Sequence, residues 1–325
     1  MKIRINLTNK LLTLYFRLYI FVLIEIVDMK TKNISENFLA IEDEFSSYEN
    51  SKIVILPVPY EHTTSYGQGT ALGPDAIIEA SHYVEFYDEE FNSQLCFDKG
   101  IATLYSIEFN GKHDKEALDL IEQTVDKLLA DGKFVVTLGG EHTISTAPIK
   151  SHFKKYPEMS ILHFDAHSDL RENYEDNPYS HASFMHRVVE FFGTKNITQV
   201  GIRAQCIEEA NFIKQNNINT FYAWQIRRKI WGDNWQKVVA DTLAENVYVT
   251  FDVDCFDPSL MPSTGTPEPN GLFYAEVLDI FYEMQKQNKK IIGFDVVELA
   301  PIEGLHHPNL TTASLVYKLM HYLKF

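Results

Sequence analysis

The stretch SILHFDAHSD, residues 160–169, carries the most information about this chain. An apolar run leads into alternating acidic and imidazole side chains. Alternate side chains of a β-strand lie on one face, so Asp165 and His167 should point the same way, about 6–7 Å apart at the backbone. If the strand continued, Asp169 would lie roughly 13 Å from Asp165, too far to share a metal ion. We therefore expect the strand to end near Ser168, with the chain turning so that Asp169 comes back.

Two more polar clusters follow apolar runs. His142 comes after a Gly-Gly pair at the end of the run 133–138, and Asp252 and Asp254 close the run 246–252. The carboxyl ends of parallel strands share one edge of a sheet, so the three clusters should meet there. One such cluster alone could be a solvated turn or a helix cap. The coincidence of three indicates a metal centre.

The pooled ligand candidates are four aspartates and two histidines. So many carboxylates close together would destabilise a core unless cations neutralised them. A pair of divalent ions about 3.5–4 Å apart is common in hydrolases. Oxygen-rich ligation without thiolates favours Mn²⁺ over structural Zn²⁺. His163 shares the strand face of Asp165 but lies deeper, so we assign it a structural or supporting role.

Apolar runs alternate with amphipathic segments from residue 53 onward. The predicted strands are 53–58, 101–104, 133–138, 160–167, 197–202, 219–224, 246–252 and 290–297. The predicted helices are 74–81, 113–130, 208–215, 235–244, 272–287 and 311–323. This alternation, without internal repeats or linkers, predicts one α/β domain over residues 29–325 with a mainly parallel central sheet.

The composition is that of a soluble globular protein, with 45% hydrophobic and 23% charged residues. The formal net charge of −16 argues against binding nucleic acid or an anionic membrane surface, and it is compatible with a cationic small molecule. The three cysteines are far apart and form no CxxC pair. This pattern fits a reducing, cytoplasmic setting.

Residues 1–28 differ from the rest of the chain. Basic residues precede the apolar run 11–24, as in a signal peptide, but Arg17 interrupts the run and no small-residue cleavage site follows. The run is also shorter than the roughly 18 residues that a membrane span needs. Met29 then begins a polar stretch. We interpret residues 1–28 as an N-terminal extension, either loosely attached or produced by a mis-assigned start codon. A signal peptide is the less favoured alternative.

The motifs of the three clusters, together with the run Gly265-Thr266-Pro267-Glu268-Pro269, resemble those of the ureohydrolases, the arginase and agmatinase family. The resemblance extends from about residue 53 to residue 323. It implies a three-layer α/β sandwich of the arginase/deacetylase type, two Mn²⁺ ions per chain and hydrolysis of a guanidino group to urea and an amine. It also implies a homo-oligomer, a trimer or hexamer.

The family's roles are carried over by motif. One ion would be held by His142, Asp165, Asp169 and Asp252, and the other by His167, Asp165, Asp252 and Asp254. Asp169 would also pass a proton to the leaving amine. Glu298 would hold the guanidinium through paired hydrogen bonds, and His181 would shuttle protons. The alternatives are an exposed strand-end glutamate for Glu298 and an ordinary loop histidine for His181.

The composition of the loop after the second cluster, residues 170–179, gives an indication of the substrate. This loop is acidic and aromatic, whereas arginase holds an α-amino acid head with hydroxyl and amide side chains. A distal ammonium would be favoured beside Glu172, Glu175 or Asp176, which indicates hydrolysis of agmatine to putrescine and urea. Arg171 could bind a carboxylate if it pointed inward, but we expect it to pair locally or to face solvent.

Other functions remain open at this point. They are guanidinobutyrase, arginase, formiminoglutamase and guanidine hydrolase activities, which share the metals and differ in the substrate loops. A zinc deacetylase of the same broad fold would use fewer metal ligands than the six candidates found here. A non-catalytic metal-binding protein is the remaining alternative.

Overall fold

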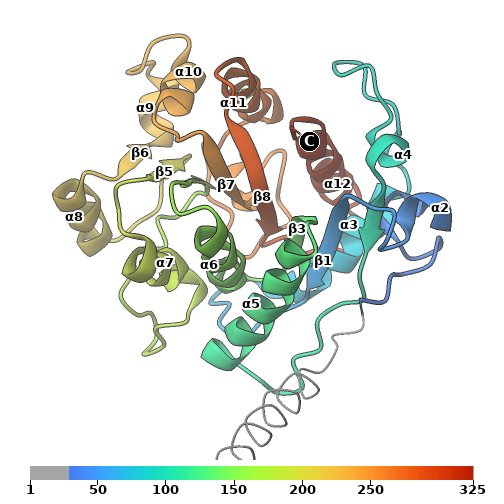
Figure 1. The fold of residues 1–325 in the computed structure, drawn as a ribbon. Helices are drawn as coiled ribbons and strands as arrows, with labels where there is room; N and C mark the ends of the chain where they lie inside the picture. Colours follow the sequence, from blue (N-terminus) through green and yellow to red (C-terminus); the bar gives the residue numbers. More distant parts are fainter. Residues whose placement is uncertain (1–28, 325) are drawn as a thin grey trace, which may run out of the picture. The chain divides into compact units, whose positions relative to one another are not determined.

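Eight strands form one sheet at the centre of the fold, in the order β2-β1-β3-β8-β7-β4-β5-β6 (Figure 1). Every strand pairing in this sheet is parallel. The strands are β1 (Ile53–Val58), β2 (Ile101–Thr103), β3 (Phe134–Gly139), β4 (Ser160–Phe164), β5 (Ile197–Val200), β6 (Asn219–Phe221), β7 (Asn246–Asp252) and β8 (Lys290–Val297). The computed structural model describes residues 29–324, so the predicted extension lies outside the described residues. From residue 31 onward, the described part of the chain forms one compact unit.

Helices cover both faces of the sheet. The α-helices are α2 (Asp43–Ser46), α3 (Gly73–Ser81), α4 (Leu95–Lys99), α5 (Asp114–Ala130), α6 (Thr146–Lys155), α7 (Phe184–Phe192), α8 (Ile207–Asn216), α9 (Ala223–Arg227), α10 (Trp235–Asp241), α11 (Tyr274–Lys286) and α12 (His307–His321). Short 3₁₀ helices are η1 (Phe38–Ala40), η2 (Thr70–Leu72), η3 (His142–Ser145), η4 (His181–Ser183) and η5 (Val253–Cys255). α5, α6 and α7 pack in sequence on one side, and the pairs α3/α12 and α10/α11 lie on the other (Figure 1).

The alternation of side chains along β7 explains the layers. Val247, Val249 and Phe251 join the core that includes α10, α11 and α12, while Tyr248 joins the core on the side of α6 and α7. A strand buried on both faces reads as a continuous apolar run, as β7 does. The three-layer α/β sandwich with a parallel central sheet is therefore confirmed.

The eight predicted strands are all present, with differences at their ends. β4 ends at Phe164 and not at residue 167, because the Asp165 carboxylate turns back to accept the backbone N–H of His167 at 2.5 Å. β6 ends at Phe221, and α9 takes up the following residues. α6 and α7 were not predicted, and neither were the short helices α2, α4 and α9. In α6 (TAPIKSHFKK), polar residues interrupt the apolar pattern. α7 (FMHRVVEFF) has a clear apolar face, with Phe184, Met185 and Val188 buried, which the prediction from sequence did not use.

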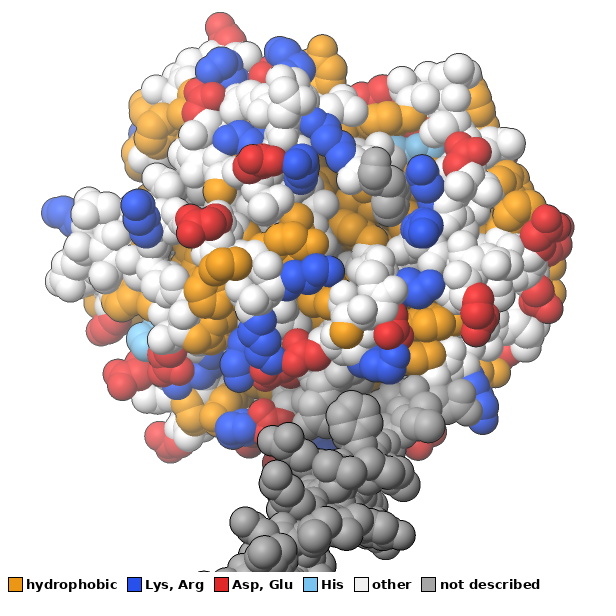
Figure 2. Space-filling view, viewed as in Figure 1, with side chains coloured by type: hydrophobic (Ala, Val, Ile, Leu, Met, Phe, Trp, Pro, Cys, Tyr) orange, Lys and Arg blue, Asp and Glu red, His pale blue; other side chains and the backbone are white. Residues whose placement is uncertain are grey.

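Charge is mixed on the face drawn in Figure 2, where acidic and basic side chains are interspersed. The net negative charge is therefore not gathered into one patch on that face. Within residues 29–324, none of the helices has the length and apolar character needed to cross a membrane.

The strand order determines where polar side chains can meet. β3, β8, β7 and β4 are consecutive neighbours in the sheet. Their carboxyl ends lead directly into His142, Glu298, Asp252 and Asp165. Residues more than 150 positions apart in sequence thereby come to one edge of the sheet, where ligands bind in parallel α/β folds.

Candidate metal centre

The segment after β4 turns back as the sequence predicts. Asp165 donates its backbone N–H to the carbonyl of Val200 at 3.1 Å and is wholly buried. Asp169 has a φ of +52°, a left-handed conformation that few non-glycine residues adopt. The turn brings the Asp169 carboxylate to 3.5 Å from Nδ1 of His142.

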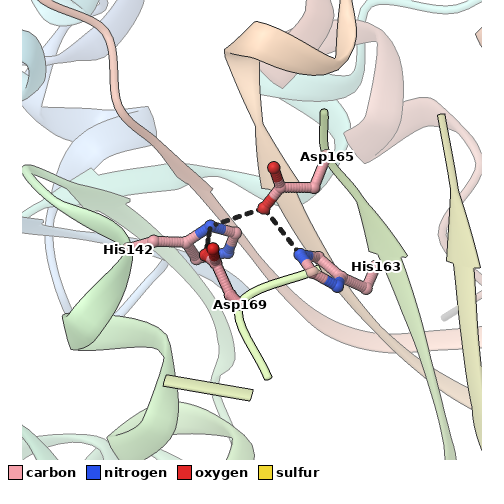
Figure 3. A group of neighbouring side chains, drawn as sticks. All are labelled: His142, His163, Asp165 and Asp169. Atoms are coloured by element: carbon pink, nitrogen blue, oxygen red, sulfur yellow. Dashed lines mark hydrogen bonds and ion pairs between the residues drawn. The ribbon is translucent and has the colours of Figure 1, made fainter. Parts of the chain in front are cut away.

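One group of ligand candidates surrounds Nδ1 of His142. Carboxylate oxygens of Asp165, Asp252 and Asp169 lie 3.0, 3.3 and 3.5 Å from this nitrogen. Figure 3 shows the carboxylates of Asp165 and Asp169 turned toward the ring of His142 from separate segments of the chain. All four side chains are buried, so bulk water screens these carboxylates only weakly.

A second group adjoins the first. Nδ1 of His167 lies 2.9 Å from Asp254 Oδ2 and 3.5 Å from Asp165 Oδ1. Asp254 donates its backbone N–H to Asp252 Oδ1 at 2.8 Å. The two oxygens of Asp165 thus face different histidines, one in each group. The structure brings all six predicted metal-ligand residues together.

The tautomer of His142 can be derived from its hydrogen bonds. Thr250 donates its single hydroxyl proton to Asp295 at 2.7 Å, so its oxygen accepts from Nε2 of His142 at 2.9 Å. When the ring is neutral, its single proton therefore lies on Nε2 and the lone pair of Nδ1 faces the carboxylates. Nδ1 is also a buried atom without a hydrogen-bond partner among the described residues. A lone pair facing three carboxylate oxygens fits a bound cation, and a buried hydroxyl and carboxylate behind the ring are typical support for a metal ligand.

The electrostatics indicate the same need for positive charge. Burial, reinforced by Asp165, raises the pKa of Asp169 well above its usual range. Burial, reinforced by Asp254 and Asp165, does the same to the pKa of Asp252. Burial alone would lower the pKa of His142, but the hydrogen bond and charge of Asp165, with the charges of Asp169 and Asp295, together outweigh it and raise that pKa to about 9. These shifts describe excess buried negative charge, which divalent cations would neutralise.

His163 lies where a supporting residue should. Its Nε2 is 2.7 Å from Asp165 Oδ2 (Figure 3). Its Nδ1 accepts from the amide of Gln199 at 3.0 Å. Gln199 also donates to the carbonyl of Ser168 at 2.9 Å, which identifies the amide nitrogen as the donor. His163 therefore carries its proton on Nε2 and donates a hydrogen bond from it to Asp165. Nε2 then has no free lone pair with which to bind a metal ion. The geometry agrees with the supporting role expected from the sequence.

A cavity of about 260 Å³ opens beside the two groups. Five of the predicted site residues line it, namely His167, Asp169, His181, Asp252 and Glu298. Its wall also carries Ser65, Arg171, Tyr174, Ala182, Ala204, Gln205, Glu209, Thr266 and Glu268. The predicted ammonium partners Glu172, Glu175 and Asp176 are not among its lining residues.

Glu298 is buried and not an exposed strand-end residue. Its φ is +65°, and it accepts the backbone N–H of His142 at 2.6 Å. Burial, followed by the nearby Glu141, raises the pKa of Glu298 to about 8. A carboxylate held in a left-handed conformation on the cavity wall carries backbone strain of the kind that clusters at functional sites.

Arg203, which the sequence reasoning missed, supports the third cluster. Its guanidinium donates to the backbone carbonyls of Asp254 at 2.6 Å, Phe256 at 3.2 Å and Glu268 at 2.8 Å. It joins the turn after β7 to the 265–269 run. An arginine just beyond the predicted strand 197–202, three residues after the end of β5, was the available signal.

The two glycines that precede His142 lie where the backbone is crowded. A Cβ on Gly140 would lie 2.0 Å from the carbonyl oxygen of Tyr60, and Gly139 is still part of β3. Gly140 is needed because the loop after β1 passes directly over it. That approach brings residues 60–73 to the edge of the site.

Comparisons with known proteins agree with this site. The arginase-family profile matches residues 51–324. An N(1)-aminopropylagmatine ureohydrolase from Synechocystis sp. is 39% identical over 286 residues, covering 86% of this chain and 92% of that protein. An agmatinase from Bacillus anthracis is 36% identical over 260 residues, covering 79% and 86%. The agmatine ureohydrolase structure from Thermoplasma volcanium has a TM-score of 0.76 at 26% identity, covering 91% and 95%. The chain therefore belongs to the arginase family and is an amidinohydrolase.

Proposed function

We propose that this protein hydrolyses agmatine to putrescine and urea with two Mn²⁺ ions per chain. The observation that carries the proposal is the buried convergence of four aspartates and two histidines beside a cavity that also presents Glu298. Two imidazoles and four carboxylates, without a thiolate, suit Mn²⁺. Putrescine is a polyamine precursor, so the reaction would belong to polyamine biosynthesis in the cytoplasm.

The ligand sets follow from the two groups. One ion would be held by His142, Asp165, Asp169 and Asp252, and the other by His167, Asp165, Asp252 and Asp254. Asp165 faces both histidines, which supports its role as a bridge. Asp252 supports the same role, because one oxygen lies near Nδ1 of His142 and the other accepts from the backbone of Asp254.

Bound as a pair, the ions would lower the pKa of water toward neutrality and so supply the nucleophile. The chain's own residues bind and orient the substrate. Glu298 would pair with the guanidinium, because a carboxylate matches that planar cation through two charge-assisted hydrogen bonds. Asp169 and His181 line the same cavity and would transfer protons, Asp169 toward the leaving amine.

The cavity wall also supports a cationic tail on the substrate. Arg171 is the only Arg or Lys that lines the cavity among the described residues, and Glu209 lies 3.9 Å from its Nε. Arg171 also stacks over Tyr174, with 5.1 Å from guanidinium carbon to ring centroid. These contacts hold Arg171 locally, and the Glu209 carboxylate offsets part of its charge, which weakens its attraction for a substrate carboxylate. Glu268, on the same wall, would attract the ammonium of agmatine in place of the loop acids that the sequence favoured.

N1-aminopropylagmatine is the second candidate substrate. The relative with 39% identity carries that substrate in its name, and the relative with 36% identity is named an agmatinase. The added aminopropyl group is cationic, so the same acidic wall would tolerate it.

The test loads the purified protein with Mn²⁺, measures bound metal by elemental analysis and follows urea release. Agmatine, N1-aminopropylagmatine, arginine, 4-guanidinobutyrate and guanidine are compared. Arginine is the matched control, because it differs from agmatine only by a carboxylate. We expect two Mn²⁺ per chain and kcat/KM at least about 100-fold higher for agmatine than for arginine, which corresponds to about 3 kcal/mol.

Fewer than two bound ions per chain would contradict the metal assignment, and absence of urea from every substrate would contradict the activity. Higher kcat/KM for N1-aminopropylagmatine than for agmatine would make it the substrate. Light scattering of the same sample tests the proposed trimer or hexamer.

A further inference from the structure

Glu141 is a buried carboxylate that the proposed metal site does not use. It directly precedes His142 and is completely shielded from solvent. Its two oxygens accept four hydrogen bonds, from the backbone N–H groups of His62 and Thr63 at 2.7 Å each and from the hydroxyls of Thr63 and Thr143 at 2.8 Å each. All four partners are donors, so the carboxylate acts purely as an acceptor. Its buried position needs an explanation beyond packing.

Thr63 connects this carboxylate to His181. Its hydroxyl oxygen accepts the backbone N–H of His181 at 3.0 Å and lies 3.2 Å from the ring nitrogen Nδ1. A hydroxyl has one proton and two acceptor positions. Because the proton goes to Glu141, both acceptor positions remain for His181, and the Nδ1 contact requires a proton on Nδ1.

The opposite arrangement is less favourable. If Thr63 donated to Nδ1, its oxygen would face a Glu141 oxygen at 2.8 Å with no proton between them. Ser180 is the other hydroxyl near Nδ1, but its distance of 3.4 Å is longer. Burial lowers the pKa of His181, so its resting form is the neutral ring, for which the position of the single proton matters.

We propose that Glu141 and Thr63 are positioning residues that hold His181 as the Nδ1–H tautomer, so that Nε2 is the atom that exchanges protons in the substrate cavity. His181 lines that cavity, and both supporting residues act through its ring. The inference rests on the proposed function, because it assigns an atom to the proton transfer suggested for His181. It also makes the loop after β1, which carries Thr63, part of the catalytic arrangement.

The first test is Thr63→Val, which keeps the shape of threonine and removes the hydroxyl. A positioned proton-transfer group contributes about 10²–10⁴-fold to rate, so losing its orientation should lower kcat by about 10- to 100-fold. We expect KM to change less than about twofold. Thr63→Ser, which keeps the hydroxyl, should restore most of kcat. Thr64→Val is the matched control, because the Thr64 hydroxyl contacts Glu61 at 3.3 Å and not His181.

A double-mutant cycle separates this role from loop packing. Once His181 is replaced by asparagine, Thr63→Val should cost little more, because the two residues act as a unit. If Thr63→Val lowers kcat equally in both backgrounds, its effect is structural and the proposal is overturned. Unchanged kcat in Thr63→Val overturns it as well.

The tautomer can be measured without activity. The full chain, labelled with ¹⁵N-histidine and loaded with diamagnetic Mg²⁺, gives ring-nitrogen signals whose shifts distinguish protonated from unprotonated positions. Comparison with His181→Asn assigns one of the 12 histidines. A protonated Nδ1 in the wild type, lost in Thr63→Val, is the expected result, and a protonated Nε2 overturns the proposal. If this spectrum is as expected but His181→Asn keeps full activity, the proton-transfer role of His181 fails and the hydrogen-bond relay stands.

Discussion

Replacing Glu298 by glutamine tests how the guanidinium is held. The amide has nearly the same size, and its oxygen can still accept the backbone N–H of His142, which lies 2.6 Å from the carboxylate. The substitution therefore preserves the local fold and removes only the negative charge. Glu298 is outside the proposed ligand sets, so both metal ions should remain.

The loss can be estimated from the interaction that disappears. A hydrogen bond to a charged partner is worth about 1.5–3 kcal/mol, and a paired carboxylate–guanidinium contact has two. Losing about 3–5 kcal/mol corresponds to a roughly 10²- to 10⁴-fold decrease in kcat/KM for agmatine. Burial, with repulsion from Glu141, raises the pKa of Glu298 to about 8, and nearby divalent cations would favour its ionised form.

The assay measures urea release, bound Mn²⁺ and thermal stability for wild type and Glu298→Gln. Glu303→Gln is the matched control, because this exposed glutamate follows the same strand outside the substrate cavity. Full activity in Glu298→Gln refutes the guanidinium role. Loss of metal would instead make Glu298 part of the metal site.

Three further outcomes are expected. Asp252→Asn should lower bound Mn²⁺ below two per chain and abolish urea release; unchanged metal content would remove Asp252 from the ligand sets. Gly140→Ala should lower the melting temperature by several degrees, because its Cβ would lie 2.0 Å from the Tyr60 carbonyl oxygen and overpacking costs about 1–3 kcal/mol. Burial lowers the pKa of His152 from 6.5 to about 4, so the unfolded chain binds this proton first as pH falls. The contribution of His152 to the free energy of unfolding is complete above pH 6.5. It should be lost as the pH falls toward 4, by about 3 kcal/mol in total. Urea unfolding of His152→Gln should lack this part of the pH dependence, and an equal dependence in both proteins would contradict it.

The sheet was predictable because a parallel strand that is buried on both faces is a nearly continuous apolar run in the sequence. β1, β7 and β8 are continuous apolar runs, and their predicted bounds match the structure. The predicted strand 160–167 is three residues longer than β4, because Asp165 and His167 keep a strand-like alternation beyond the point where the chain leaves the sheet. The alternation of residue types does not reveal that the Asp165 carboxylate accepts the backbone N–H of His167 and so ends the strand.

The ligand candidates were predictable because each follows an apolar strand, and parallel strands bring such positions to one edge. The substrate wall was not predictable in the same way. Glu172 and Glu175 suggested an ammonium site from their place in the loop, yet the cavity is lined by Arg171, Tyr174 and Glu268. Loop residues have no fixed period, so the sequence does not indicate which of them face inward.

The hydrogen-bond relays show what lies beyond sequence reasoning. Asp295 and Thr250 act on His142, and Glu141 and Thr63 are proposed to act on His181 in the same way. In each case a threonine gives its only proton to a buried carboxylate and can then only accept from the imidazole.

The two relays have opposite outcomes because they approach different ring nitrogens. At His142 the proton is held on Nε2, and the lone pair of Nδ1 faces the carboxylates of the metal centre. At His181 the proton would be held on Nδ1, which leaves Nε2 for the substrate cavity. Under the proposed function, one arrangement would prepare a metal ligand and the other a proton carrier. The ring nitrogen that the threonine contacts, and not the residue types involved, would then decide between these two roles.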